Sequence, residues 1–350
     1  MTLNDRINAF SRLGELFSFY INNNADYQNL ESNSNALKLY NIVHALKHKN
    51  GWFTVAQVNH SIEQWAKALE QSNLNSWVNN YNIKDTSSLT IGIVMAGNIP
   101  LVGMHDLLSI LITGNKALIK TSSNDKDLML FVTEFLMDYY NYFKEKIEFT
   151  ETKLENYDAV IATGSNNTAR YFEYYFKDKP SIIRKNRNSV AVLTGDETQE
   201  QLSLLGEDIF RYYGLGCRSV SKIFVPENYN FDNFFKAIFD FNYLIKEDKF
   251  TNNYDYNKAV YLMSEFKILD NGFLILKEDK SYSSPIGSLF YEYYDSKKAL
   301  IEKLDKDKNL LQCVVNLPEN ENYVNFGHTQ QPSLYDYADN IDTLEFLLKI

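Results

Sequence analysis

Residues 89–104 read LTIGIVMAGNIPLVGM, an apolar run rich in β-branched residues followed by a loop with glycine, asparagine and proline. A short apolar run that ends in such turn residues is typical of a buried β-strand. The apolar segment 101–112 that follows has helical length. This stretch therefore predicts a strand, a loop and a helix in succession.

The same pattern recurs further along the chain. Three apolar runs alternate with segments of helical length: KALIK from Lys116, YDAVIAT from Tyr157 and NSVAVL from Asn188. Strands that alternate with helices are typical of βαβ units and a parallel sheet. We therefore predict an α/β fold in which residues 86–205 form a doubly wound cofactor-binding domain.

The flanking regions differ in pattern. Residues 1–85 carry apolar side chains at helical spacing without alternation, which predicts a helical N-terminal cap. New apolar runs, beginning with SKIFVP, follow the loop at 214–217 and predict a second α/β, catalytic domain at 206–320. Residues 321–350 are predicted to return to the cofactor domain.

Composition narrows the class of protein. The 35 Lys and Arg residues against 45 Asp and Glu give a charge of -10, which disfavours nucleic acid as a partner. The N-terminus lacks the pattern of a signal peptide, and no apolar run is long enough to span a membrane. We expect a soluble, cytoplasmic protein without a membrane span.

The two cysteines, Cys217 and Cys313, belong to no metal-binding or disulfide pattern. Cys217 directly follows Gly216 in a loop that also contains Gly214 and is open to a ligand, and Arg218 beside it favours the nucleophilic thiolate. The alternative is a small residue in a tight turn. Cys313 lies inside the apolar run LLQCVV and is predicted to be core.

Polar residues follow the first two predicted strands, at the edge where doubly wound folds bind ligands. Asn98 can donate a hydrogen bond to a developing oxyanion. Lys120, with Ser122 and Ser123, can bind a ribose or a phosphate. A capped helix start explains the two serines almost as well.

Gly164 and Ser165 follow the third strand and precede a helix. Backbone amides at a helix N-terminus are suited to a pyrophosphate. The chain contains neither G-x-G-x-x-G nor G-x-x-x-x-G-K-[ST], which disfavours an ordinary Rossmann dehydrogenase and a P-loop NTPase.

Histidines give a weaker signal. His44 and His48 have i, i+4 spacing but no H-E-x-x-H glutamate between them, and we predict no metal site. His105 and His328 are each compatible with a base near Cys217 and with a capping or packing role.

In chain order, AGNIP with Asn98, ALIKTSS with Lys120, ATGS with Gly164 and YYGLGCRS with Cys217 resemble the aldehyde dehydrogenase superfamily. Within it, residues 89–350 resemble the acyl-CoA reductases of the luciferase-operon type, which are fatty acid reductases. The resemblance implies an aldehyde dehydrogenase-like fold and reduction of an acyl thioester to an aldehyde with NAD(P)H.

The resemblance also implies roles for individual residues. Cys217 would take the acyl group as a thioester intermediate, and Asn98 with the Cys217 backbone amide would form the oxyanion hole. Hydride from the nicotinamide would then give a thiohemiacetal that releases the aldehyde. The implied cofactor-binding residues are Lys120, Ser122, Ser123, Gly164 and Ser165.

The preferred cofactor is predicted to be NADPH, with NADH also usable. In NAD-selective aldehyde dehydrogenases a glutamate soon after the strand-end lysine holds the ribose hydroxyls, whereas here Thr121-Ser122-Ser123-Asn124 follows Lys120, with Asp125 close by. The implied substrate is an acyl-CoA or an acyl-protein. The resemblance allows an acyl-transferring partner enzyme and a homo-oligomer.

One motif departs from the superfamily. Where its members carry a glutamate base in Glu-Leu-Gly-Gly-Lys, residues 183–188 read IRKNRN. We expect Arg184, Lys185 and Arg187 to face the site, where they remain protonated and cannot act as bases. Two alternative functions stay open: oxidation of an aldehyde to an acyl-CoA, as in acylating aldehyde dehydrogenases, and a non-catalytic acyl-binding protein.

Overall fold

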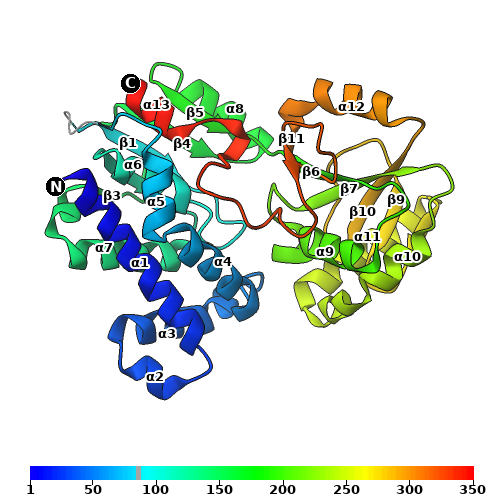
Figure 1. The fold of residues 1–350 in the computed structure, drawn as a ribbon, viewed down its shortest axis with the longest axis horizontal. Coiled ribbons are helices and arrows are strands. Elements are labelled where there is room, and N and C mark those ends of the chain that lie inside the picture. Colours follow the sequence, from blue (N-terminus) through cyan, green and yellow to red (C-terminus); the bar gives the residue numbers. More distant parts are fainter. Residues whose placement is uncertain (84–87) are drawn as a thin grey trace. The chain divides into compact units, whose positions relative to one another are not determined.

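The computed structural model describes residues 1–83 and 88–350. The chain divides into two compact units: unit 1 comprises Met1–Lys185 and Ser333–Ile350, and unit 2 comprises Asn186–Pro332 (Figure 1). The structure thus divides the chain earlier than the boundary expected at 205/206. The boundary expected at 85/86 lies outside the described residues.

Unit 1 contains a five-stranded parallel sheet in the order β3-β2-β1-β4-β5. Its strands are β1 (Thr90–Val94), β2 (Lys116–Lys120), β3 (Ile147–Phe149), β4 (Ala159–Thr163) and β5 (Ser181–Arg184). Its helices between strands are α6 (Met104–Ile112), α7 (Lys126–Tyr139) and α8 (Asn166–Tyr175), with the 3₁₀ helix η1 (Asn141–Glu145). Since the chain order reverses between β1 and β4, the carboxyl ends of these strands border the switch point of the sheet.

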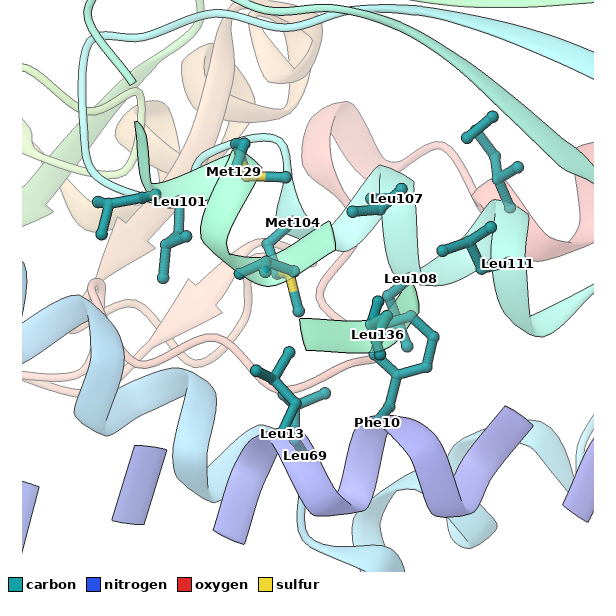
Figure 2. Close-up of a cluster of buried hydrophobic side chains, with 14 of the residues drawn as sticks. Phe10, Leu13, Leu69, Leu101, Met104, Leu107, Leu108, Leu111, Met129 and Leu136 are labelled. Atoms are coloured by element: carbon teal, nitrogen blue, oxygen red, sulfur yellow. The ribbon is translucent and has the colours of Figure 1, made fainter. Parts of the chain in front are cut away.

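The helical N-terminal cap is part of unit 1. It contains α1 (Leu3–Asn23), α2 (Tyr27–Glu31), α3 (Ser34–Lys49), α4 (Val55–Ala68) and α5 (Gln71–Val78). Thr2 and Asp5 form a capping box that starts α1. Phe10 and Leu13 of α1 point toward Leu108 of α6 and Leu136 of α7 in one continuous core (Figure 2). Burial of this shared apolar surface stabilises the cap on the sheet domain.

The C-terminal segment of unit 1 ends in the 3₁₀ helix η5 (Ala338–Asn340) and in α13 (Thr343–Lys349), drawn in red in Figure 1. It is bound to α5 and to the residues after it by side-chain hydrogen bonds. Trp77 Nε1 donates to the Tyr337 hydroxyl over 2.8 Å, and the Tyr81 hydroxyl donates to Asp342 over 2.6 Å.

Unit 2 contains a seven-stranded sheet in the order β12-β11-β6-β7-β10-β9-β8, in which only the β8–β9 pair is antiparallel. Its strands are β6 (Asn188–Val192), β7 (Val220–Pro226), β8 (Ile268–Asp270), β9 (Ile275–Glu278), β10 (Ser288–Tyr294), β11 (Leu311–Val315) and β12 (Tyr323–Val324). Its helices are α9 (Gln199–Phe210), α10 (Phe231–Ala237), α11 (Asp248–Met263) and α12 (Lys297–Lys306), with the 3₁₀ helices η2 (Arg211–Gly214), η3 (Phe239–Lys246) and η4 (Lys308–Leu310).

The expectation that the run NSVAVL belongs to the first sheet is wrong. This run forms β6, which pairs with β7 and β11 in the sheet of unit 2. The place beside β4 is taken by β5, a short strand that the sequence analysis did not identify. A continuous apolar run indicates a buried strand but does not say which sheet contains it.

Within the described residues, no helix is long and apolar enough to cross a membrane.

Candidate active site

Cys217 lies in unit 2 on an exposed turn between α9 and β7. The chain reaches this turn through three consecutive left-handed residues, Tyr212, Tyr213 and Gly214, whose φ values are 54°, 57° and 76°. Glycine adopts this conformation without strain, but a tyrosine does not. Both tyrosine side chains are buried, and their packing offsets the cost of the bend that presents Cys217.

Hydrogen bonds fix the backbone on both sides of Cys217. The Ser189 hydroxyl of β6 donates to the Cys217 carbonyl over 2.9 Å, and it accepts from the Cys313 backbone amide of β11 over 3.1 Å. The Ser219 amide donates to the Gly216 carbonyl over 3.0 Å and closes the turn. The prediction that Cys313 is core is confirmed, since its side chain is fully buried in β11.

A distant segment, residues 327–330, is attached to the Cys217 turn. The Arg218 guanidinium donates to the Thr329 carbonyl, and the Gln330 amide donates to the Ser219 hydroxyl over 3.1 Å. The predicted effect of Arg218 on the Cys217 thiol stays a prediction, but the same side chain also holds this loop. No local pattern indicates this contact, because Arg218 and Thr329 are 111 residues apart in the chain.

Asp208, near the end of α9, binds the same loop through its carboxylate. Its carboxylate, only 1% exposed, accepts from the amides of Gly327 over 2.7 Å and Thr329 over 2.9 Å. Burial raises the pKa of Asp208 to about 6, although the two amides oppose this shift. No motif or spacing in the sequence indicates a role for Asp208.

The raised pKa of Asp208 makes the stability of unit 2 depend on pH. Folding favours the protonated acid, so this contribution is complete below about pH 4 and is lost as the pH rises through about 6. We expect the unfolding free energy of the wild type, relative to that of Asp208→Asn, to fall by up to about 3 kcal/mol across this range. Chemical denaturation at several pH values, with the exposed Asp196→Asn as the matched control, measures it. An Asp208→Asn difference that does not change with pH would contradict the raised pKa.

In unit 1, the Asn98 loop lies against the loop that follows β2. A Cβ atom on Gly97 would stand 2.4 Å from the Ser122 hydroxyl, so only glycine allows this approach. On the other side, the Ser61 hydroxyl of α4 donates to the Pro100 carbonyl over 2.9 Å. Leu101, with a φ of 57°, places its side chain in the core beside Met104 (Figure 2). The Asn98 side chain itself is exposed.

Lys120 ends β2 and is partly exposed, and Ser123 is exposed one turn further on. The Ser122 hydroxyl accepts from the Asn124 amide over 3.3 Å within the loop before α7, but the N-cap residue of α7 is Asp125 and has no side-chain capping hydrogen bond, so the alternative of a serine-capped helix start is wrong. Asp125 is turned inward and is 2% exposed, facing the amides of Leu101 and Val102. Burial raises the pKa of Asp125 well above its ordinary value, so this residue places no negative charge beside Ser123.

Gly164 and Ser165 connect β4 to α8. Ser165 is the N-cap residue of α8, and its hydroxyl accepts from the Thr168 amide over 3.2 Å. Because β4 pairs with β1 in parallel, this helix start lies at the same sheet edge as the Asn98 loop. Unit 1 therefore brings the predicted residues Asn98, Ser122 and Ser165 to one edge of its sheet.

The expectation that Arg184 faces the site is wrong. Its side chain is 6% exposed and forms a buried ion pair with Asp106 of α6, and it donates to the Thr343 hydroxyl of α13 over 3.0 Å. The sequence could not reveal these partners because they lie on other elements. Lys185 pairs with Glu173 at the surface over 2.6 Å.

His105 has a packing role, one of the alternatives that the sequence left open. Its Nε2 atom lies 3.0 Å from the Leu334 carbonyl, and its ring contacts those of Trp77 and Tyr337 edge-on. Burial lowers the pKa of the imidazole. In the part of the chain that the structure describes, no group of three or more His, Cys, Asp or Glu side chains could hold a metal ion.

The fold is that of the aldehyde dehydrogenases. An NAD-dependent benzaldehyde dehydrogenase from Corynebacterium glutamicum superposes with a TM-score of 0.64 at 11% identity, covering 90% of this chain and 76% of that one. An aldehyde dehydrogenase from Bacillus cereus, also solved with NAD+, superposes with a TM-score of 0.60 at 14% identity, covering 92% and 73%. At these identities the similarity shows the fold alone.

The sequence narrows this class further. The model of the acyl-CoA reductase (LuxC) family matches residues 42–240, more than half of the chain, and the chain belongs to that family. It is an oxidoreductase that acts on acyl or aldehyde groups. No curated protein sequence matches the chain at a significant level.

Proposed function

We propose that this protein reduces an acyl-CoA to the corresponding aldehyde through an S-acyl intermediate on Cys217. The observation that carries the proposal is the contrast between the two thiols of an acyl-CoA reductase family member. Cys217 is exposed on a turn fixed by Ser189, whereas Cys313 is buried in a strand. An exposed thiol on a rigid backbone suits a nucleophile that must meet a large thioester.

The reaction begins with attack of the Cys217 sulfur on the acyl carbonyl, which breaks the original thioester bond and releases coenzyme A. Asn98, exposed at the end of its loop, is the proposed side-chain donor to the oxyanion that develops. The turn around Cys217 is held by backbone hydrogen bonds before the substrate arrives, so little reorganisation accompanies the attack.

Unit 1 has the groups to hold a nicotinamide dinucleotide, which supplies hydride when it is bound. The start of α8, at the switch point of the sheet, suits the pyrophosphate, with Gly164 and Ser165 in the connecting loop. Lys120, Ser122 and Ser123 at the end of β2 are proposed to bind the adenosine ribose.

We propose NADPH as the preferred cofactor, with NADH as the weaker one. The inward orientation of Asp125 supports this choice, because the first carboxylate after Lys120 does not face the ribose-binding edge. Lysine and serine hydroxyls tolerate a 2′-phosphate, whereas a carboxylate at this place would repel it. We expect steady-state kcat/KM to favour NADPH, and Lys120→Ala to reduce that preference. A higher kcat/KM with NADH than with NADPH would show that the proposed cofactor preference is wrong.

The function is tested by intact-mass measurement of the protein after mixing with a long-chain acyl-CoA and no cofactor. We expect an adduct of acyl mass that disappears, with release of aldehyde, when NADPH is added. Absence of the adduct would contradict the proposal. An adduct that NADPH cannot discharge would favour a non-catalytic acyl-binding protein, and efficient acyl-CoA formation from aldehyde without measurable reduction would favour the acylating dehydrogenase.

A further inference from the structure

Residues 327–330 form a loop that is fixed to α9 and to the Cys217 turn by hydrogen bonds on the two sides of one exposed histidine. The amides of Gly327 and Thr329 bind the Asp208 carboxylate, and the Thr329 carbonyl binds Arg218, the residue after Cys217. Gly327 also lies close against Leu204 of α9, where a Cβ atom would stand 2.9 Å from that side chain.

His328 is the residue between these anchors. Its backbone is held, since the His328 amide donates to the Asn325 carbonyl over 3.2 Å and its carbonyl accepts from the Gln331 amide over 3.1 Å. Its side chain is exposed, unlike those of its neighbours Gly327, Thr329 and Gln330. Hydrogen bonds therefore hold the backbone of residues 327–330, and His328 is the residue of this loop whose side chain is exposed.

The charged groups that face this loop are Asp208 from α9 and Arg218 from the Cys217 turn. Both oxygens of Asp208 accept from loop amides, and Nε of Arg218 donates to the Thr329 carbonyl. Asp208 interacts electrostatically with His328, and this interaction opposes the rise of the Asp208 pKa. The imidazole of His328 is exposed, whereas the Asp208 carboxylate is 1% exposed and both of its oxygens accept from loop amides.

We propose that His328 is the proton-transfer residue for Cys217, an inference that rests on the proposed function. The imidazole takes the proton of the Cys217 thiol as the sulfur–carbon bond to the acyl group forms. It returns this proton to the sulfur of coenzyme A as the original thioester bond breaks. The acyl group moves from one sulfur to another, the proton follows in the opposite direction, and no oxidation or reduction accompanies this step.

The experiment isolates this half-reaction. Wild-type protein and His328→Gln are mixed with an acyl-CoA in the absence of cofactor, and free coenzyme A and acyl-protein are quantified after rapid quenching between pH 5.5 and pH 8.5. We expect the variant to acylate Cys217 about 10²-fold or more slowly. We also expect it to lose the change in acylation rate with pH that the wild type shows across this range.

Controls separate this role from a structural one. His48→Gln removes an exposed imidazole of unit 1 and should acylate like the wild type, while an unchanged melting temperature of His328→Gln verifies folding. His328→Asn, a second neutral variant, should reproduce the defect. Asp208→Asn keeps the imidazole of His328, so its rate of Cys217 acylation should still change with pH as in the wild type.

The outcomes are distinct. Acylation of His328→Gln at the wild-type rate, or with the wild-type pH profile, would overturn the role of His328. A pH dependence that persists in His328→Gln and vanishes in Asp208→Asn would assign it to Asp208 and also overturn the proposal. Absence of acylation in the wild type would instead contradict the proposed function, and the inference with it.

Discussion

The Cys217→Ala variant is expected to form no acyl-enzyme and to produce no aldehyde above the background of the assay. The side chain removed is the exposed thiol on the turn held by Ser189, and alanine has no group that can carry the acyl chain. The loss is expected in both half-reactions, because reduction acts on the acyl group that Cys217 holds. Intact mass with acyl-CoA alone and aldehyde release with NADPH measure the two losses separately.

The matched control is Cys313→Ala, which removes the same chemical group from β11. Since Cys313 is fully buried, we expect a stability loss of about 1 kcal/mol from the small cavity and unchanged acylation. A Cys217→Ala protein that still turns over would contradict the mechanism. Loss of acylation in a folded Cys313→Ala variant would show that the two thiols had been assigned the wrong roles.

The sequence predicted much of the fold because local patterns recur along the chain. The runs from Leu89, Lys116 and Tyr157 became neighbouring strands β1, β2 and β4, and their loops lie at one sheet edge. The contrast between a glycine-flanked Cys217 and a strand-embedded Cys313 was equally local. Side-chain burial at these positions follows from the pattern of the surrounding few residues.

Other features of the structure depend on contacts between distant segments, which local sequence patterns do not predict. The run from Asn188 has the same apolar character whichever sheet contains it, and its assignment depended on pairing with β7 and β11. The link between Asp208 and residues 327–330 joins segments far apart in the chain. A polar side chain with a distant partner has no periodic signal, because its position is decided by tertiary structure.

Arg184 is a second residue whose distant partners were not predicted, and its burial affects the free energy of unfolding. The arginine in IRKNRN looked like a cation near the site, yet the structure buries it with Asp106 at the start of α6 and with Thr343 of α13. Removing one partner of a buried ion pair leaves the other charge unpaired in a poorly solvated place. That loss typically costs about 3–5 kcal/mol.

We therefore expect Arg184→Met to lower the unfolding free energy of unit 1 by about 3–5 kcal/mol, more than any surface substitution. Chemical denaturation of the full chain, followed by the fluorescence of Trp77 and the other tryptophans of the cap, measures the loss. Lys185→Met, which removes the neighbouring exposed cation, should change stability by less than about 1 kcal/mol.

The double variant Asp106→Leu with Arg184→Met decides whether the unpaired charge is the cause. It replaces both charges with apolar side chains, and we expect it to recover most of the loss, because a buried ion pair and a well-packed apolar pair are often of similar stability. A double variant no more stable than Arg184→Met alone would contradict this explanation. The loss would then come from the missing hydrogen bond to Thr343 and from the contact of α13 with α6, so that the C-terminal helix, rather than the charge balance, would stabilise this edge of the sheet.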